Sequence, residues 1–227
     1  FVTDRPDIVI ILSDEERAAP PYEDPAVAEG RRTTLAGERW FAEHYELVDP
    51  ERHDPPGLIA HTTGDHDRPM RAAREHQRAL WDAGLAGLSV DQRFGGQGMP
   101  PEAESVVDDV SKRYATPSMV PLSVGLSLAM GTLLRFGTDD ACAVHVPRIL
   151  DASDVWCQLF SEPEAGSDLA SLRTSALPVD DGYVVSGQKV WTSFAQHSAY
   201  GLLLARTGQV EDRHRGLSLF VLPMDAP

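Results

Sequence analysis

The sequence predicts an α+β fold in which a helical N-terminal domain is followed by an antiparallel, β-barrel-like domain, with a short β/α extension in front. Before residue 150, apolar residues recur at three- and four-residue steps, which is typical of amphipathic helices. After residue 153, short apolar runs alternate with turn residues, which is typical of strands. Charge indicates a further boundary near residue 50, because residues 1–55 carry 14 acidic and 6 basic side chains, more than half of the net charge of −15. The predicted division is an extension with a linker at 1–53, a helical domain at 54–152 and a β domain at 153–227.

Helices are expected where capping and breaking residues bracket an apolar stripe. Thr33 to His44 is compatible with a helix, whereas the prolines and charges of residues 49–69 indicate a linker. Asp67 is expected to cap the next helix, whose first turn tolerates proline and which ends at Gly84. Pro101 is expected to open a further helix. The inward faces of these two helices comprise Met70, Ala73, Gln77, Leu80 and Trp81, and then Val106, Val107, Val110 and Tyr114.

The most apolar run of the chain, Ser118 to Leu134, has 17 residues. A membrane-spanning helix needs about 20 residues and tolerates few breaks, and this run contains Pro121 and two glycines. We therefore expect a buried core helix, followed by a short helix from Asp139 to Pro147.

Six strands are expected in the β domain, where the apolar pattern has a period of two. Asp180-Asp181-Gly182 has the composition of a tight turn between two of them. The predicted strands are Val155–Phe160, Arg173–Val179, Tyr183–Val185, Lys189–Ser193, Tyr200–Ala205 and Leu217–Leu222.

Composition narrows the class of protein and its partners. With 20 basic and 35 acidic residues, the chain repels nucleic acid and anionic lipid, so neither nucleic acid nor a membrane is an expected partner. Two cysteines, Cys142 and Cys157, exclude a disulfide framework and fit a reducing cytosol. The short apolar run Ile8–Leu12 lacks a basic leader and does not resemble a signal peptide. We therefore expect a cytoplasmic location.

The densest chemical signal lies in two segments about twenty residues apart. Residues 156–168 run from a strand into a loop of small residues, which lets a large planar ligand approach the main chain closely. In residues 187–193, Trp191 offers a ring to stack on an aromatic ligand, and Thr192 and Ser193 offer hydroxyl donors. Ordinary turn chemistry in the loop and a core position for the tryptophan are the competing interpretation.

Both segments resemble the signature of the flavin-dependent acyl-CoA dehydrogenases. Residues 160–168 read Phe-Ser-Glu-Pro-Glu-Ala-Gly-Ser-Asp, where the family has a strand followed by Thr/Ser-Glu-Pro-x-Ala-Gly-Ser-Asp. Residues 186–193 read Ser-Gly-Gln-Lys-Val-Trp-Thr-Ser, where the family has Asn/Ser-Gly-x-Lys-x-Trp-x-Thr/Ser. The resemblance covers about residues 54–227. Further matches in the same order are Leu80–Gly87, Phe94–Gly98, Arg135–Thr138, Pro147–Leu150 and Leu203–Thr207.

The resemblance implies an FAD-dependent oxidoreductase of fatty acid and lipid metabolism that dehydrogenates an acyl-CoA thioester at its α,β bond. The implied partners are acyl-CoA, electron-transfer flavoprotein or a similar acceptor, and other subunits of a homo- or hetero-oligomer. In the family, a C-terminal helical domain follows the β domain and supplies the catalytic base. We therefore expect a fragment with an incomplete β domain and assign no catalytic residue. The implied cofactor-binding residues are Gln158, Phe160, Ser161, Gly166, Ser167, Trp191, Thr192 and Ser193, and Ser167 is also expected to contact the substrate.

The front of the chain carries a different resemblance. Residues 5–15 resemble the first strand of the sulfatase-like hydrolases, and the likeness extends to about residue 45. Asp14 would then match a metal-ligating aspartate at the end of that strand. The nucleophile motif and the other metal ligands of those hydrolases do not follow, so no metal is expected. The alternatives to a dehydrogenase are a remnant of a metal-dependent hydrolase and a non-catalytic fused or truncated product.

Overall fold

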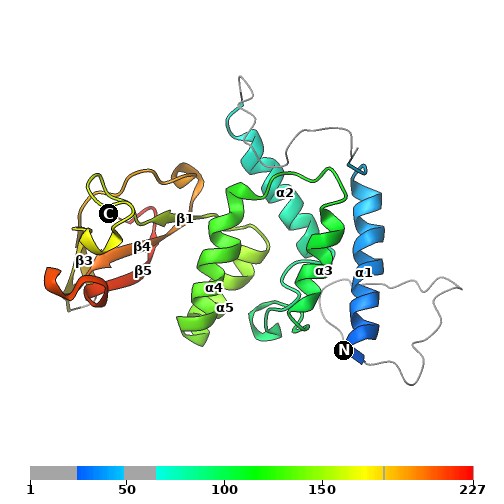
Figure 1. The fold of residues 1–227 in the computed structure, drawn as a ribbon, viewed down its shortest axis with the longest axis horizontal. Helices are drawn as coiled ribbons and strands as arrows, with labels where there is room; N and C mark the ends of the chain where they lie inside the picture. The colour runs from blue at the N-terminus through cyan, green and yellow to red at the C-terminus, as the bar shows by residue number, and fades with distance from the viewer. Residues whose placement is uncertain (1–24, 49–64, 181, 227) are drawn as a thin grey trace, which may run out of the picture. The chain divides into compact units, whose positions relative to one another are not determined.

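The computed structural model describes residues 25–48, 65–180 and 182–226 (Figure 1). These residues form two compact units. The helical unit comprises the described residues up to Pro121 together with Leu133–Ser153, and the sheet unit comprises Leu122–Thr132 and the described residues from Asp154 onward. Asp14 and the strand predicted around Ile8–Leu12 lie outside the described residues. Within the described ranges, no helix is long and apolar enough to cross a membrane.

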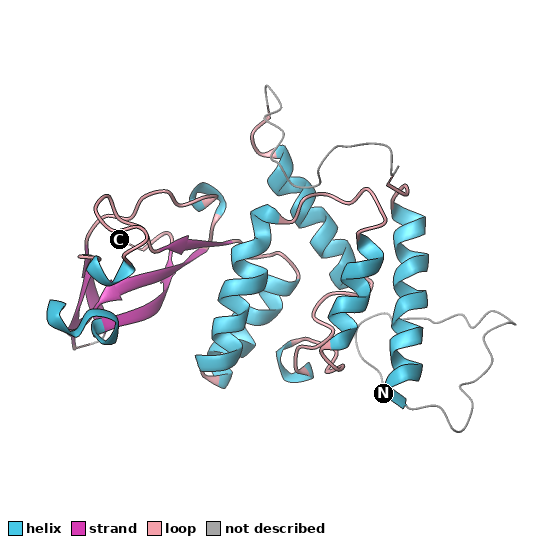
Figure 2. Ribbon diagram, viewed as in Figure 1, coloured by secondary structure: helices cyan, strands magenta, loops and turns pink. Residues whose placement is uncertain are grey.

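The helical unit contains helices at four of the five predicted places. Its main members are α1 (Pro25–His44), α2 (Arg68–Asp82), α3 (Glu102–Ser111) and α5 (Asp139–Leu150) (Figure 2). Helix α1 packs against α3, so the described part of the predicted 1–53 extension is a helix of this unit. The core between α1, α3 and the segment after α2 consists of Phe41, Leu85, Leu88, Ala103, Val107 and Val110.

The ends of the helices follow from local chemistry. Asp67 occupies the N-cap position of α2, as predicted, but its side chain makes no capping hydrogen bond. Gly84 adopts a φ of 71°, which ends α2 in the left-handed conformation that glycine tolerates. The Thr138 hydroxyl accepts a hydrogen bond from the Ala141 N–H and caps α5.

The apolar run Ser118–Leu134 is not the single buried helix that we predicted. It contains a 3₁₀ turn (Val120–Leu122), a π-helix (Val124–Ala129) and the start of α4 (Met130–Phe136). Small residues such as Gly125 and Ala129 are buried, while Leu128 and Leu134 are 36% and 40% exposed. Apolar composition alone cannot indicate which face of such a segment is covered, and the π-turn rotates that face relative to a regular helix.

The sheet unit holds five strands, β1 (Trp156–Leu159), β2 (Ser175–Val179), β3 (Gly182–Ser186), β4 (Tyr200–Arg206) and β5 (Leu217–Pro223). The described strands form an open sheet in the order β1-β4-β2-β3, with β5 also paired to β4. The pairs β2–β3 and β4–β5 are antiparallel, as expected. Strand β1 pairs with β4 in parallel, which the prediction of an antiparallel barrel did not include. On one face of the sheet, buried side chains of β1, β2 and β4 form a core that comprises Cys157, Leu159, Ala176, Leu203 and Ala205.

The predicted strand Lys189–Ser193 is wrong, because these residues form no strand. Trp191 and Phe194 have φ angles of 58° and 61°. Positive φ values are incompatible with a β-strand, and they are uncommon for large side chains. The alternation of residue types was therefore misleading here, and the segment instead connects β3 to β4 as irregular chain.

His76 is a buried titratable group of the helical unit that the sequence reading missed. It is 4% exposed, and its Nδ1 lies 2.6 Å from the Tyr45 hydroxyl oxygen. The rings of Trp40, Phe41 and Tyr45 surround it. Burial, with a smaller contribution from the charge of His44, lowers the pKa of His76 from 6.5 to about 4.

Acid should therefore destabilise the helical unit through His76. Between pH 6.5 and pH 4 the unfolded chain binds a proton at this position and the folded chain does not, so stability is complete above this window and falls as the pH falls through it. Urea unfolding followed by far-UV circular dichroism at pH 7.5 and pH 5 should show a loss of about 2 kcal/mol that His76→Gln lacks. An equal loss in both proteins would contradict this role.

Candidate functional site

The structure brings the two motif segments together within the sheet unit. Strand β1 runs into the loop of residues 160–168, and residues 187–194 pass beside the start of that loop on their way from β3 to β4. The Val190 N–H donates a hydrogen bond of 2.9 Å to the Ser161 carbonyl oxygen. Segments that are separated in the sequence therefore lie in direct contact, as the shared signature requires.

A buried ion pair joins the same two segments. The Lys189 Nζ lies 2.9 Å from a carboxylate oxygen of Glu162, and the two side chains are only 8% and 7% exposed. The same ammonium group donates to the Phe160 carbonyl oxygen at 2.9 Å. Glu162 also accepts hydrogen bonds from the main-chain N–H groups of Arg173 (2.7 Å) and Thr174 (2.9 Å). One carboxylate thus links its own loop to two other stretches of chain.

These partners keep Glu162 ionised. Burial alone would raise the pKa of Glu162, but hydrogen bonds from Thr174, Arg173 and Lys189 outweigh it and lower the pKa from 4.5 to about 2. These donors fit a structural role for Glu162 in the loop. Lys189 was not singled out as a site residue, although it is the one charged residue of residues 186–193 and a buried charge needs a partner.

Trp191 is the most unusual member of the site. Its side chain is 91% exposed, although it is large and apolar, and its main chain is left-handed with a φ of 58°. A bulky residue rarely adopts this conformation unless its surroundings impose it. Among the described residues, Trp191 therefore does not lie in the core. Thr192 beside it has a hydroxyl oxygen that is buried and finds no hydrogen-bond partner among the described residues.

The other predicted cofactor-binding residues lie in the same two segments. Gln158 is exposed at the end of β1, and Phe160 and Ser161 are half-buried. Gly166, Ser167 and Ser193 are exposed, and a Cβ placed on Gly166 would meet nothing within 4 Å. Their proximity to a common ligand remains a prediction, and the structure supplies open space above the loop in which a ligand could approach the main chain.

These features fit FAD. A flavin presents a planar aromatic ring for an uncovered indole to stack on and ring atoms that bind hydroxyl and main-chain groups. The exposed Trp191 ring, the unpartnered Thr192 hydroxyl and the open main chain at Gly166 match those requirements.

Two exposed ion pairs involve acidic residues that follow Glu162 in the loop. Glu164 pairs with Arg173 at 2.8 Å, and Asp168 pairs with Arg213 at 3.5 Å. All four side chains are more than 60% exposed. Exposed pairs contribute little because water and salt screen them. The buried pair is therefore the electrostatic contact that can fix the position of the loop.

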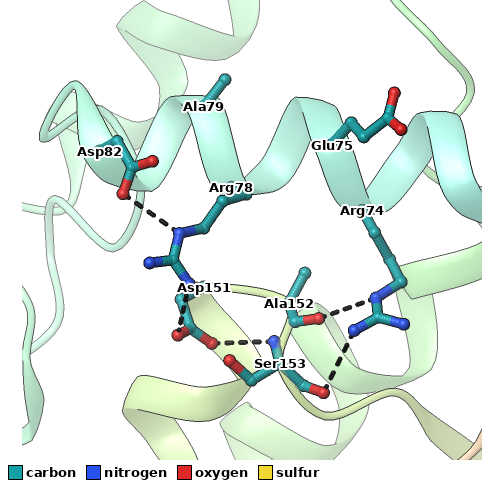
Figure 3. A pocket seen from close by; sticks show the side chains of 8 residues that line it. All are labelled: Arg74, Glu75, Arg78, Ala79, Asp82, Asp151, Ala152 and Ser153. Carbon is teal, nitrogen blue, oxygen red and sulfur yellow. Dashed lines mark hydrogen bonds and ion pairs between the residues drawn. The ribbon is translucent and has the colours of Figure 1, made fainter.

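A cavity of about 420 Å³ lies elsewhere, in the helical unit between α2 and the end of α5 (Figure 3). Arg74 donates to the carbonyl oxygens of Ala152 (3.0 Å) and Ser153 (3.5 Å). Arg78 bridges Asp82 and Asp151, at 3.2 Å each. Both guanidinium groups are engaged in joining the two helices, and none of the predicted site residues lines this cavity. We interpret it as a structural groove.

The two cysteines lie where the sequence reading placed them and serve as packing. Cys142 is 3% exposed in α5, and Cys157 is fully buried in β1. Burial raises the pKa of both thiols, which keeps them protonated and unreactive.

Gly187 should be sensitive to substitution, because it sits against the main chain that binds Glu162. A Cβ at Gly187 would lie 2.3 Å from the Thr174 hydroxyl oxygen and 2.6 Å from its Cα. Gly187→Ala should destabilise the sheet unit by about 1–3 kcal/mol, as measured by chemical unfolding. Gly166→Ala is the matched control, since nothing lies within 4 Å of its Cβ, and its stability should change little. Equal effects of the two substitutions would refute this packing argument.

Comparison with known proteins identifies the family. The acyl-CoA dehydrogenase N-terminal domain model matches residues 58–153, and the acyl-CoA dehydrogenase middle domain model matches residues 157–227. Acyl-CoA dehydrogenase IpdE1 of Mycobacterium tuberculosis is 39% identical over 163 residues, which cover 68% of this chain and 42% of that protein.

Solved structures give the same result. The ChsE4-ChsE5 complex from Mycobacterium tuberculosis matches with a TM-score of 0.64 and 28% identity, covering 92% of this chain and 49% of that chain. The Tcur3481-Tcur3483 steroid ACAD matches with a TM-score of 0.64 and 27% identity, covering 90% and 49%. This chain therefore spans less than half the length of these three proteins. Two successive domain matches, in the order and at the positions of the helical and sheet units, place this chain in the acyl-CoA dehydrogenase family.

Proposed function

We propose that this chain provides the FAD-binding half of an enzyme that dehydrogenates an acyl-CoA thioester at its α,β bond. The observation that carries the proposal is the uncovered indole of Trp191, held on a left-handed main chain beside the signature loop. An exposed aromatic side chain on a left-handed main chain has no folding benefit, and it is explained if a planar ligand covers it.

Bound FAD would supply the two-electron oxidation, while the protein supplies orientation and electrostatics. In the proposal, Trp191 packs on the ring system, and the hydroxyl groups of Ser161, Thr192 and Ser193 bind its polar edge. Gly166 and Ser167 let the main chain approach the cofactor, and Ser167 also contacts the acyl-CoA. Gln158 and Phe160 complete the lining from the end of β1.

The proton acceptor of the reaction is proposed to lie outside the two motif segments. A base must be free to take a proton, and Glu162 is instead buried, ionised and bound by several donors. Asp168 is exposed and pairs with Arg213. We propose that a helical domain from a longer form of this chain, or from another subunit, supplies the base.

The substrate and partners are proposed from the relatives. One similar structure is a steroid ACAD and another is a ChsE4-ChsE5 complex, so we propose a steroid-derived acyl-CoA as substrate and a hetero-oligomer as the working form. Electron-transfer flavoprotein or a similar acceptor would reoxidise the cofactor, and the cytoplasm would be the location.

The domain boundaries are also a proposal. We propose that residues 54–152 and 153–227 correspond to the N-terminal and middle domains. The packing of α1 on α3 supports treating the described part of residues 1–53 as an additional helix of the N-terminal domain.

Flavin binding tests the proposal directly. The 227-residue chain titrated with FAD should quench flavin fluorescence and become yellow after removal of free FAD. Trp191→Ala should weaken binding about tenfold, because loss of a stacked aromatic contact costs about 1.4 kcal/mol.

The matched control is Tyr183→Ala, since Tyr183 is another exposed aromatic residue of the sheet unit that lies in β3, outside both segments. Its FAD affinity should equal that of the unmodified chain. A chain that is colourless after incubation with saturating FAD and removal of the free cofactor would disprove binding by this half alone, and equal losses in the two variants would disprove the role of Trp191.

A further inference from the structure

The two flavin-binding segments proposed above are held together by very few polar contacts. The Val190 N–H binds the Ser161 carbonyl oxygen, and the Lys189 ammonium group binds both the Phe160 carbonyl oxygen and the Glu162 carboxylate, each at 2.9 Å. Glu162 directly follows Ser161, and Lys189 precedes Trp191 by two residues. Both Ser161 and Trp191 are proposed to contact the flavin. A change in the distance between these two side chains would therefore move both halves of the site.

Glu162 extends this connection to a third segment. It binds the main-chain N–H groups of Arg173 and Thr174 just before β2, and Gly187 allows the second segment to approach Thr174 closely. The carboxylate therefore links the loop, the Trp191 segment and the start of β2. Apart from the isolated bridge between Glu162 and Ala165, these segments lie outside the ladder of the sheet, so such a link fixes their positions relative to one another.

Because the Glu162–Lys189 pair is buried, its two charges attract each other more strongly than those of the exposed pairs nearby. Its side chains are 7% and 8% exposed, whereas Arg173 and Glu164, which form the next pair along the loop, are 80% and 70% exposed. Charges removed from water interact strongly and tolerate few geometries, while exposed pairs are screened and mobile. The loop thus offers a buried and an exposed glutamate pair that can be compared directly.

We propose that Glu162 and Lys189 are positioning residues that hold the two segments in the arrangement that binds the flavin. The inference rests on the proposed function, because it assigns to the pair a role in that same site. Neither residue needs to touch the cofactor. Their role is to keep the Ser161 main chain and the Trp191 segment in register.

The experiment compares FAD affinity and thermal stability in Lys189→Met, Glu162→Gln and the double variant. Each single variant leaves a buried group without its partner, so both should lose stability and bind FAD at least about tenfold more weakly. The double variant removes both charges and should regain most of the stability, because burying two neutral groups avoids the uncompensated charge. Its FAD affinity should stay low, since the link between the segments is still missing.

Glu164→Gln is the matched control. It removes the carboxylate of the exposed pair in the same loop, and it should leave both stability and FAD affinity within about twofold of the unmodified chain. Lys189→Arg should recover part of the affinity, because it restores a cation that can reach the Glu162 carboxylate. The visible circular dichroism of bound FAD should change in Lys189→Met and not in Glu164→Gln, since it reports the surroundings of the ring.

Affinity that simply follows stability, so that the double variant binds FAD like the unmodified chain, would overturn the proposal. If the unmodified chain binds no FAD, the proposed function fails, and hydrogen exchange of the Val190 amide then decides the positioning role. Faster exchange in Lys189→Met than in Glu164→Gln would support a link between the segments, and equal exchange would overturn it.

Discussion

The buried contact between Glu162 and Lys189 is the constraint on which the rest of the site depends. Two charges are removed from water, and the attraction between them offsets that cost only because main-chain N–H groups and a carbonyl oxygen complete their hydrogen bonds. Removing one partner from such a pair typically costs about 3–5 kcal/mol. The segments on either side lie outside the strands of the sheet, apart from the isolated bridge between Glu162 and Ala165, so the contact between them follows from this pair and from the Val190–Ser161 hydrogen bond.

Once those segments are fixed, an exposed aromatic ring becomes possible. Trp191 follows Lys189 by two residues, and its left-handed main chain turns the indole away from the sheet core. Stability alone would favour a smaller or polar side chain at an exposed left-handed position. The cost of this conformation is balanced by the buried contacts of the residues around it, which is the arrangement expected of a binding site that is formed before its ligand arrives.

Sequence reasoning succeeded where one periodicity governs a whole element. Helix α2 has its apolar stripe, its proline in the first turn and its glycine stop, and all appear as predicted. It failed where local pattern and tertiary contacts disagree. Residues 189–193 alternate like a strand, but Trp191 has a positive φ; Ser118–Leu134 is uniformly apolar, but a π-helix divides it. The parallel pairing of β1 with β4 joins distant segments and leaves no local signal.

The candidate site could be located from the sequence, because its two segments are short and carry spaced signature residues. The ion pair that joins the two segments could not be predicted from the sequence. Lys189 and Glu162 are 27 residues apart and form a pair only once the chain between them has folded into β2 and β3. That dependence also explains why the site residues are fixed by the sheet unit itself. Strands β2 and β3 return residues 187–194 to the end of β1, and burial then gives the pair its strength. In the proposed function, the geometry offered to a flavin is therefore a product of sheet folding, and a second domain contributes the remaining face and the base.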